Sequence, residues 1–122
     1  MKKQILVVDD DRGAVALLEN RLTDLGFEVL KAFDGQEGLA LVKKTPPDLI
    51  ILDQMMPKMD GVRVCALLKA DRRFAKIPVI IFTASAEKVD QKMSEQAGAD
   101  LFLTKPYNIP VLLQNIQRML GA

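Results

Sequence analysis

The chain has 122 residues, of which 49% are hydrophobic and 27% charged, and its formal net charge is +1. This length and composition are typical of one globular domain with a sizeable core, and the small net charge gives no sign of a nucleic-acid or membrane surface. The absence of histidine excludes Ser-His-Asp and Cys-His catalysis, most zinc sites and a phosphohistidine formed within the chain.

The first half of the chain predicts three short strands separated by two helices. The strands are the apolar runs at residues 5–8, 27–30 and 49–52. The first helix carries four apolar residues at helical spacing: Val15, Leu18, Leu22 and Leu25. The second helix covers residues 36–44, and Pro46 follows it.

The second half predicts three helices and two further strands. A helix over residues 62–70 precedes the apolar runs at 79–82 and 101–103, which flank a fourth helix. That helix has only a thin apolar stripe: Val89, Met93 and Ala97. The fifth helix begins at Asn108 as its N-cap and has one apolar face: Ile109, Leu112, Leu113, Ile116 and Leu120. Glycines stand where three of the helices should end: Gly26, Gly98 and Gly121.

The strict alternation of strands and helices predicts an α/β fold with a parallel sheet covered on both faces. The runs at 49–52 and 79–82 are almost wholly aliphatic, as expected of central strands. No part of the sequence indicates a linker or a repeat. We therefore expect one domain over residues 1–122.

Polar side chains follow four of the five predicted strands. In chain order these are Asp9, Asp10, Asp11, Asp53, Thr83 and Lys105. Each alone is an ordinary turn or cap residue, but the carboxyl ends of parallel strands meet at one edge, where ligands bind. Two carboxylates about 4 Å apart repel by about 4 kcal/mol at an effective dielectric of about 20. The joint placement therefore predicts a site that holds a compensating cation.

Magnesium is the cation that this set of oxygens favours, because it prefers carboxylates, waters and phosphate. An ion between Asp10 and Asp53 would turn their repulsion into coordination. Successive side chains of a strand point to opposite faces, so Asp9 and Asp10 cannot both ligate in the same way. One of them holds a water or orients Lys105. Asp11 is expected to cap the first helix.

Four segments together resemble the receiver domain of two-component response regulators. They are "VVDDD" at 7–11, "DLIILDQMMPKMDG" at 48–61, "VIIFTA" at 79–84 and "LTKPY" at 103–107. The similarity covers essentially the whole chain. It implies a single doubly wound, flavodoxin-like sheet of five parallel strands in the order 2-1-3-4-5, with five helices.

The resemblance also implies a role for each residue of the site. Asp53 would be the phosphoacceptor, taking a phosphoryl group from a phosphohistidine on a sensor histidine kinase or a histidine phosphotransfer protein. Asp10, Asp53 and the backbone carbonyl of Met55 would bind Mg²⁺, with Asp9 in support. Lys105 would contact the phosphoryl oxygens, and the Lys105–Pro106 peptide bond would be cis.

Thr83 would contact the same oxygens and, together with Phe102, would act as a switch. The switch would alter a surface formed by the fourth helix, fifth strand and fifth helix, where a downstream protein docks and where Val111 is expected to face outward. The chain would be a signalling phosphoacceptor that catalyses only its own phosphorylation and dephosphorylation. No contact with nucleic acid or membrane is expected.

Three positions depart from the commonest pattern of that family. One is Gly13, early in the first helix, where glycine weakens the helix propensity. Gln54 follows the expected phosphoacceptor where apolar residues are frequent, and Phe102 lacks the hydroxyl of the tyrosine often found there. Met55 and Ser85 are expected to flank the path of the water that hydrolyses the phosphoryl group. Because the thioether of Met55 cannot hold that water by a strong hydrogen bond, it is expected to shield the site.

Other interpretations stay open at this point. The chain is either a free-standing receiver or a receiver module cut from a longer regulator or hybrid kinase. An aspartate-nucleophile phosphatase resembles D-x-D, but Met55 stands at the second position. A flavodoxin-like electron carrier shares the fold, but carboxylates after the first strand would repel a cofactor phosphate, and no Gly-rich phosphate motif is present.

A cytoplasmic location is expected from three features of the sequence. The longest apolar runs are far shorter than a membrane span. The N-terminal sequence "MKKQILVVDDD" lacks the features of a signal peptide. Cys65 is the only cysteine, which suits a reducing compartment. Its spacing from Val62 and Leu68 predicts that it packs in the core.

Overall fold

The computed structural model describes residues 2–83, 88–106 and 108–121, with backbone only for residues 88–91. Strands and helices alternate: β1 (Gln4–Val8), α1 (Arg12–Asp24), β2 (Glu28–Ala32), α2 (Gly35–Lys44), β3 (Leu49–Asp53), α3 (Gly61–Lys69), β4 (Val79–Thr83), α4 (Lys88–Gln96), β5 (Leu101–Thr104) and α5 (Ile109–Leu120). The strands form one parallel sheet in the order β2-β1-β3-β4-β5. The predicted fold class and strand order are confirmed.

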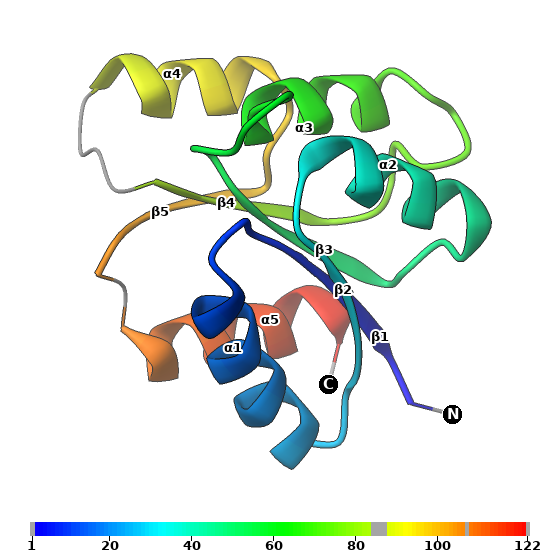
Figure 1. Cartoon of the computed structure of the whole chain (residues 1–122), viewed down its shortest axis with the longest axis vertical. Helices are drawn as coiled ribbons and strands as arrows, with labels where there is room; N and C mark the ends of the chain where they lie inside the picture. Colours follow the sequence, from blue (N-terminus) through cyan, green and yellow to red (C-terminus); the bar gives the residue numbers. More distant parts are fainter. Residues whose placement is uncertain (1, 84–87, 107, 122) are drawn as a thin grey trace.

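The sheet divides the apolar core into two layers. Helices α1 and α5 cover one face, and α2, α3 and α4 cover the other (Figure 1). Because side chains alternate along each strand, Val7 and Ile51 pack towards α1 and α5, whereas Val8 and Leu52 pack towards α2 and α3. Every residue of β3 and β4 is buried, which confirms that these are central strands.

Helix boundaries follow capping chemistry. Asp11 accepts hydrogen bonds from the backbone N–H groups of Gly13 and Ala14, so its predicted role as the cap of α1 is confirmed. Asn108 accepts a hydrogen bond from the N–H of Val111 at the start of α5. The three glycines predicted to end helices all adopt positive φ angles: Gly26, Gly98 and Gly121.

Two details of the first α/β unit differ from expectation. Leu25 was expected on the core face of the first helix, but α1 ends at Asp24 and Leu25 is 45% exposed. Strand β2 starts one residue later than predicted and extends to Ala32. Its end is determined by pairing with β1, which continues to the pair Val8–Ala32. The apolar pattern does not contain that information.

The thin apolar stripe expected on the fourth helix is only partly buried. Met93 is exposed, and Ala97, just beyond the end of α4, packs against the core from a half-buried position. Ser94 occupies the fully buried position instead, and its hydroxyl has no hydrogen-bond partner among the residues that the structure describes. The side chain of Val89 lies outside the described residues. Among the side chains that the structure describes in α4, residues 92–96, the core contact is therefore small, in agreement with the prediction.

Cys65 is fully buried on α3, which confirms its predicted place in the core. Burial raises the pKa of its thiol to about 11, so it stays protonated and unreactive near neutral pH. Among the described residues, we found no helix with the length and apolar character needed to cross a bilayer.

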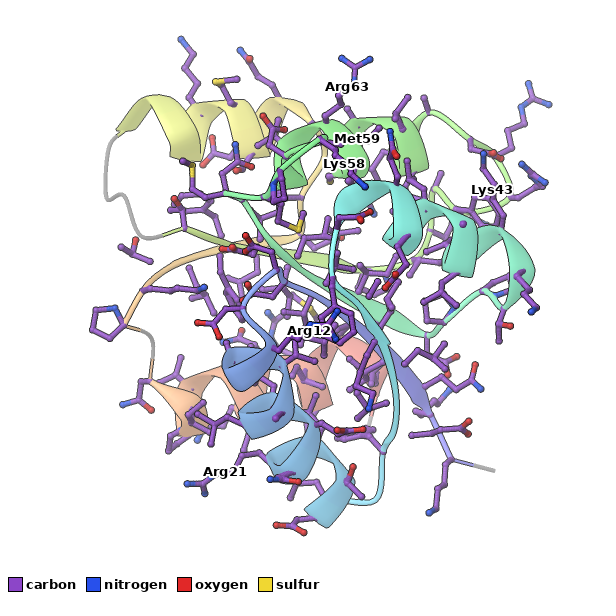
Figure 2. All side chains as sticks on the ribbon, in the orientation of Figure 1. Arg12, Arg21, Lys43, Lys58, Met59 and Arg63 are labelled. Atoms are coloured by element: carbon purple, nitrogen blue, oxygen red, sulfur yellow. The ribbon has the colours of Figure 1, made fainter. Side chains whose placement is uncertain are left out.

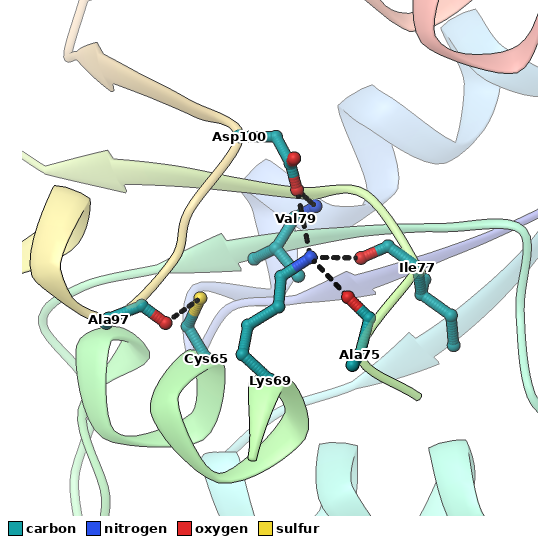
Figure 3. Close-up of polar contacts among 7 residues, drawn as sticks. All are labelled: Cys65, Lys69, Ala75, Ile77, Val79, Ala97 and Asp100. Atoms are coloured by element: carbon teal, nitrogen blue, oxygen red, sulfur yellow. Dashed lines mark hydrogen bonds and ion pairs between the residues drawn. The ribbon is translucent and has the colours of Figure 1, made fainter. Parts of the chain in front are cut away.

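A polar network joins three elements at the edge of the sheet opposite the carboxyl ends of the strands (Figure 3). The ammonium of Lys69, at the end of α3, donates hydrogen bonds to the carbonyls of Ala75 (3.1 Å) and Ile77 (2.8 Å). It also pairs with the carboxylate of Asp100 (3.1 Å), which accepts a hydrogen bond from the N–H of Val79 (2.8 Å). This network fixes α3 to the starts of β4 and β5.

We predict that Lys69→Met destabilises the fold by about 1–3 kcal/mol, because the methionine keeps the apolar stem but leaves two carbonyls and the Asp100 carboxylate without their donor. Urea denaturation measures the change. The control is Lys76→Met, which alters an exposed lysine in the same connection and should change the free energy of unfolding by less than about 0.5 kcal/mol. Equal effects of the two substitutions would contradict this role for Lys69.

Candidate functional site

The candidate site lies at the carboxyl edge of the sheet, where β1, β3, β4 and β5 end. In the parallel register Val8 lies opposite Leu52, so the residues that follow, Asp9 and Asp53, leave adjacent strands side by side. Thr83 ends β4 and is fully buried. Lys105 comes directly after β5, and its backbone N–H donates a hydrogen bond to the carbonyl of Thr83 (2.7 Å).

Lys105 forms the central contact of the site. Its ammonium lies 3.2 Å from Oδ2 of Asp9 and 3.3 Å from Oδ1 of Asp53. Both carboxylates are buried, and the lysine side chain is partly exposed. Of the two alternatives left open by the sequence, Asp9 is the residue that contacts Lys105. The Lys105–Pro106 peptide bond is cis, as the resemblance implied.

The electrostatics of this contact favour a protonated lysine beside a crowded carboxylate. Burial raises the pKa of Asp53 to about 6, the Asp9 carboxylate adds to the rise, and the Lys105 ammonium opposes it. Burial lowers the pKa of Lys105, but Asp53 and Asp9 raise it by more, so it lies above its ordinary value. Asp53 is therefore mostly ionised at pH 7, but it carries its charge at a cost that a further cation would remove.

Asp9, Asp10 and Asp53 can each offer one carboxylate oxygen, and these oxygens lie within 4.8 Å of one another. Hard oxygen ligands of this kind fit Mg²⁺. The two oxygens of Asp9 already accept hydrogen bonds, one from the N–H of Asp11 (3.0 Å) and one from Lys105. Asp10 is exposed. This arrangement favours Asp10 and Asp53 as direct ligands and Asp9 as a supporting residue.

Met55 lies two residues after Asp53, in the loop that follows β3. Its side chain is 67% exposed and so does not pack in the core. Ser85, expected to flank the same approach, lies outside the described residues. Its role stays a prediction.

Phe102 is half-buried on β5, opposite Ile81 of β4, and packs with the core layer beneath α3 and α4. Thr83 lies two residues after Ile81, so it faces the same side of the sheet. A cavity of about 240 Å³ borders Phe102 and is also lined by Glu95 and Leu101. The structure therefore places both expected switch residues on one face of the sheet, with a cavity bordering Phe102.

Sequence reasoning did not predict two features around the site. A groove of about 490 Å³ runs beside Lys105 between α1 and the start of α5 and is lined in part by Leu17 and Ile109. Leu17 lies outside the buried apolar stripe of α1. An apolar residue at such a position is the feature of the sequence that indicates an exposed apolar surface here. Figure 2 shows Arg12 at the start of α1. Its guanidinium carbon lies over the ring of Phe33, 3.9 Å from the ring centroid.

Comparison with known proteins agrees with this geometry. The family model of the response regulator receiver domain matches residues 5–117. RpaA of Synechocystis sp., named as a DNA-binding dual master transcriptional regulator, is 40% identical over 117 residues, which cover 96% of this chain and 48% of RpaA. The chain thus spans about half the length of that curated relative.

Two solved structures show the same fold. The receiver domain of a histidine kinase from Syntrophus aciditrophicus is 35% identical, with a TM-score of 0.92, and the match covers 98% of this chain and 90% of that one. A CheY-like receiver domain protein from Methanospirillum hungatei is 30% identical, with a TM-score of 0.93, and the match covers 99% of this chain and 95% of that one.

Receiver domains are signalling phosphoacceptors, and the parallel sheet with a lysine and an acidic cluster at its carboxyl edge agrees with that class. The chain belongs to the response regulator receiver domains. Members of this family receive their phosphoryl group from histidine kinases.

Proposed function

We propose that Asp53 accepts a phosphoryl group from a phosphohistidine on a partner protein in a Mg²⁺-dependent reaction, and that this event switches a partner-binding surface. The observation that carries the proposal is the position of the Asp53 carboxylate, buried beside Asp9 and 3.3 Å from the ammonium of Lys105. A carboxylate that is crowded by another acid and paired with one cation is ready for a second cation and for an electrophilic phosphorus.

In the proposed reaction a carboxylate oxygen of Asp53 attacks phosphorus. The new P–O bond forms as the P–N bond to the donor imidazole breaks, and the imidazole, protonated on its other ring nitrogen, leaves as a neutral group. No general base is required, because Asp53 is mostly ionised at neutral pH. The absence of histidine from this chain requires the donor imidazole to belong to a partner, either a sensor histidine kinase or a histidine phosphotransfer protein.

The remaining residues of the site position and neutralise the phosphoryl group. Asp10, Asp53 and the backbone carbonyl of Met55 would hold Mg²⁺, with Asp9 in support, and the ion would neutralise charge on the equatorial oxygens. Lys105, whose pKa is raised, would move part of its contact from Asp53 to those oxygens. Phosphorylation of Asp53 and hydrolysis of the resulting aspartyl phosphate, which releases inorganic phosphate, are then the only reactions that the chain catalyses.

The proposed partners are proteins. A downstream protein would dock on the surface of α4, β5 and α5, where Val111 is exposed, as expected. RpaA is named as a DNA-binding regulator, but the small net charge of this chain supports protein contacts for the receiver itself. A cytoplasmic location fits a reduced Cys65 and a histidine-kinase donor.

The first test is phosphorylation by acetyl phosphate with Mg²⁺. We predict that the parent protein gains one phosphoryl group, and that Asp53→Asn, which keeps the side-chain volume but lacks the nucleophilic oxygen anion, gains none. EDTA should prevent the reaction of the parent. Intact-protein mass spectrometry measures the added mass. The control is Asp48→Asn, an exposed position at the opposite end of β3, which should react like the parent. Full labelling of Asp53→Asn would exclude this residue as the phosphoacceptor.

The second test concerns the switch. Thr83 would turn towards the phosphoryl group, and the ring of Phe102 would move within the space beside it. Beryllofluoride, which imitates the phosphoryl group on a carboxylate, should therefore shift the NMR signals of Phe102 and of Leu101 and Glu95 around the cavity. In Thr83→Ala these shifts should fall to less than half. Unchanged signals around the cavity in the parent protein, at full beryllofluoride binding, would contradict the switch.

A further inference from the structure

Gln54, the residue directly after the proposed phosphoacceptor, joins three elements through hydrogen bonds. It is only 6% exposed. Its backbone N–H donates to the carbonyl of Phe82 on β4 (2.7 Å), and its carbonyl accepts from the N–H of Gly61 (3.1 Å). Its side-chain Oε1 accepts from the N–H of Val62 in the first turn of α3 (2.7 Å). One residue thus connects β3, β4 and α3.

The side chain of Gln54 and that of Asp53 have separate tasks because they leave the strand on opposite faces. Asp53 faces Lys105, whereas Gln54 reaches α3 on the other side of the sheet. The start of α3 lies directly against the peptide of Asp53, since a Cβ atom at Gly61 would lie 2.6 Å from the Asp53 carbonyl oxygen. A shift of the first turn of α3 towards β3 would therefore push on the backbone of the phosphoacceptor.

The bonds of Gln54 close the loop formed by residues 55–60 at its base. The outer part of this loop rests on the start of α2: the ammonium of Lys58 pairs with Asp34 (3.6 Å), and the carbonyl of Met59 packs on Gly35. Figure 2 shows Lys58 and Met59 where the loop passes α2. The inner part begins with Met55 and is fixed by Gln54. This inner part carries the backbone carbonyl proposed to bind Mg²⁺.

We propose that Gln54 is a positioning residue for the phosphoacceptor site. Its hydrogen bond to Val62 holds the base of the loop closed, and this fixes the Asp53 carboxylate and the Met55 carbonyl in the arrangement that binds Mg²⁺. The inference rests on the proposed function. An apolar residue at this position fills the same space but leaves the Val62 N–H without that acceptor. The glutamine thus replaces a packing contact with a directional one.

Two substitutions separate the hydrogen bond from the shape of the side chain. Gln54→Met keeps the length of the side chain and removes the acceptor. Gln54→Glu keeps an acceptor oxygen at the same distance along the side chain. Lys69→Met is the control for stability, because it weakens the network at the opposite edge of the sheet and leaves the loop untouched.

The rate of hydrogen exchange of the Val62 amide in metal-free protein measures whether the hydrogen bond is formed. A Mg²⁺ titration followed by backbone amide shifts measures the Kd of the site. In Gln54→Met we expect Val62 to exchange at least tenfold faster and the Kd for Mg²⁺ to rise at least fivefold. Gln54→Glu should restore protection of Val62 and bind Mg²⁺ at least as tightly as the parent. Lys69→Met should keep the parent Kd even if it is less stable than Gln54→Met.

An unchanged Kd in Gln54→Met would overturn the proposal and show that the glutamine only stabilises the fold. If Gln54→Met fails to fold, Gln54→Glu decides: a weaker Kd while Val62 stays protected, or an unchanged Kd when that protection is lost, would also overturn it. Phosphorylation of the parent at Asp53 is measured separately. A parent that is phosphorylated while Gln54→Met keeps its Kd refutes the positioning role alone. A parent that binds Mg²⁺ but is not phosphorylated refutes the proposed function alone.

Discussion

The arrangement of the candidate site depends on the contact of one ammonium with two buried carboxylates. Lys105 lies between Asp9 and Asp53, and its single positive charge leaves the acidic cluster, which also includes Asp10, with an excess of negative charge. Burial raises the pKa of Asp53, and the neighbouring Asp9 and Asp10 carboxylates add to that rise. A fold that only needed stability would place apolar or neutral residues here. The crowding of these negative charges is therefore best understood as the condition for binding a metal ion and a phosphoryl group.

The rest of the structure holds these charges in place. The parallel order puts β1 beside β3 and β4 beside β5, so four strands deliver their polar ends to one edge. At that edge Gln54 bonds to both β4 and α3. At the opposite edge Lys69 fixes α3 to the connection that leads into β4 and, through Asp100, to the start of β5. Helix α3 is thus held at both ends, while the described side chains of α4, residues 92–96, provide little apolar anchorage. This difference suits a switch that moves α4 and leaves the phosphoacceptor fixed.

Much of this could be predicted from the sequence, because a short apolar run that ends in a polar residue marks both a strand and its functional end. Asp53, Thr83 and Lys105 were located in this way. The choice between Asp9 and Asp10 as the partner of Lys105 was left open, since it depends on which face of the sheet Val8 occupies. The bonds of Gln54 and Lys69 go to backbone groups of loops and helix starts, whose paths the apolar pattern does not determine. Leu25 was misplaced because the helix stops one residue before it.

A direct titration of the Asp53 carboxyl group by carbon-detected NMR, with and without Mg²⁺, tests the central claim most sharply. Without metal, we expect a pKa of about 6, so the group keeps its proton to a higher pH than an ordinary aspartate does. With saturating Mg²⁺ the pKa should fall below the ordinary value of about 4. An ordinary pKa in the metal-free protein that does not respond to Mg²⁺ would contradict the account.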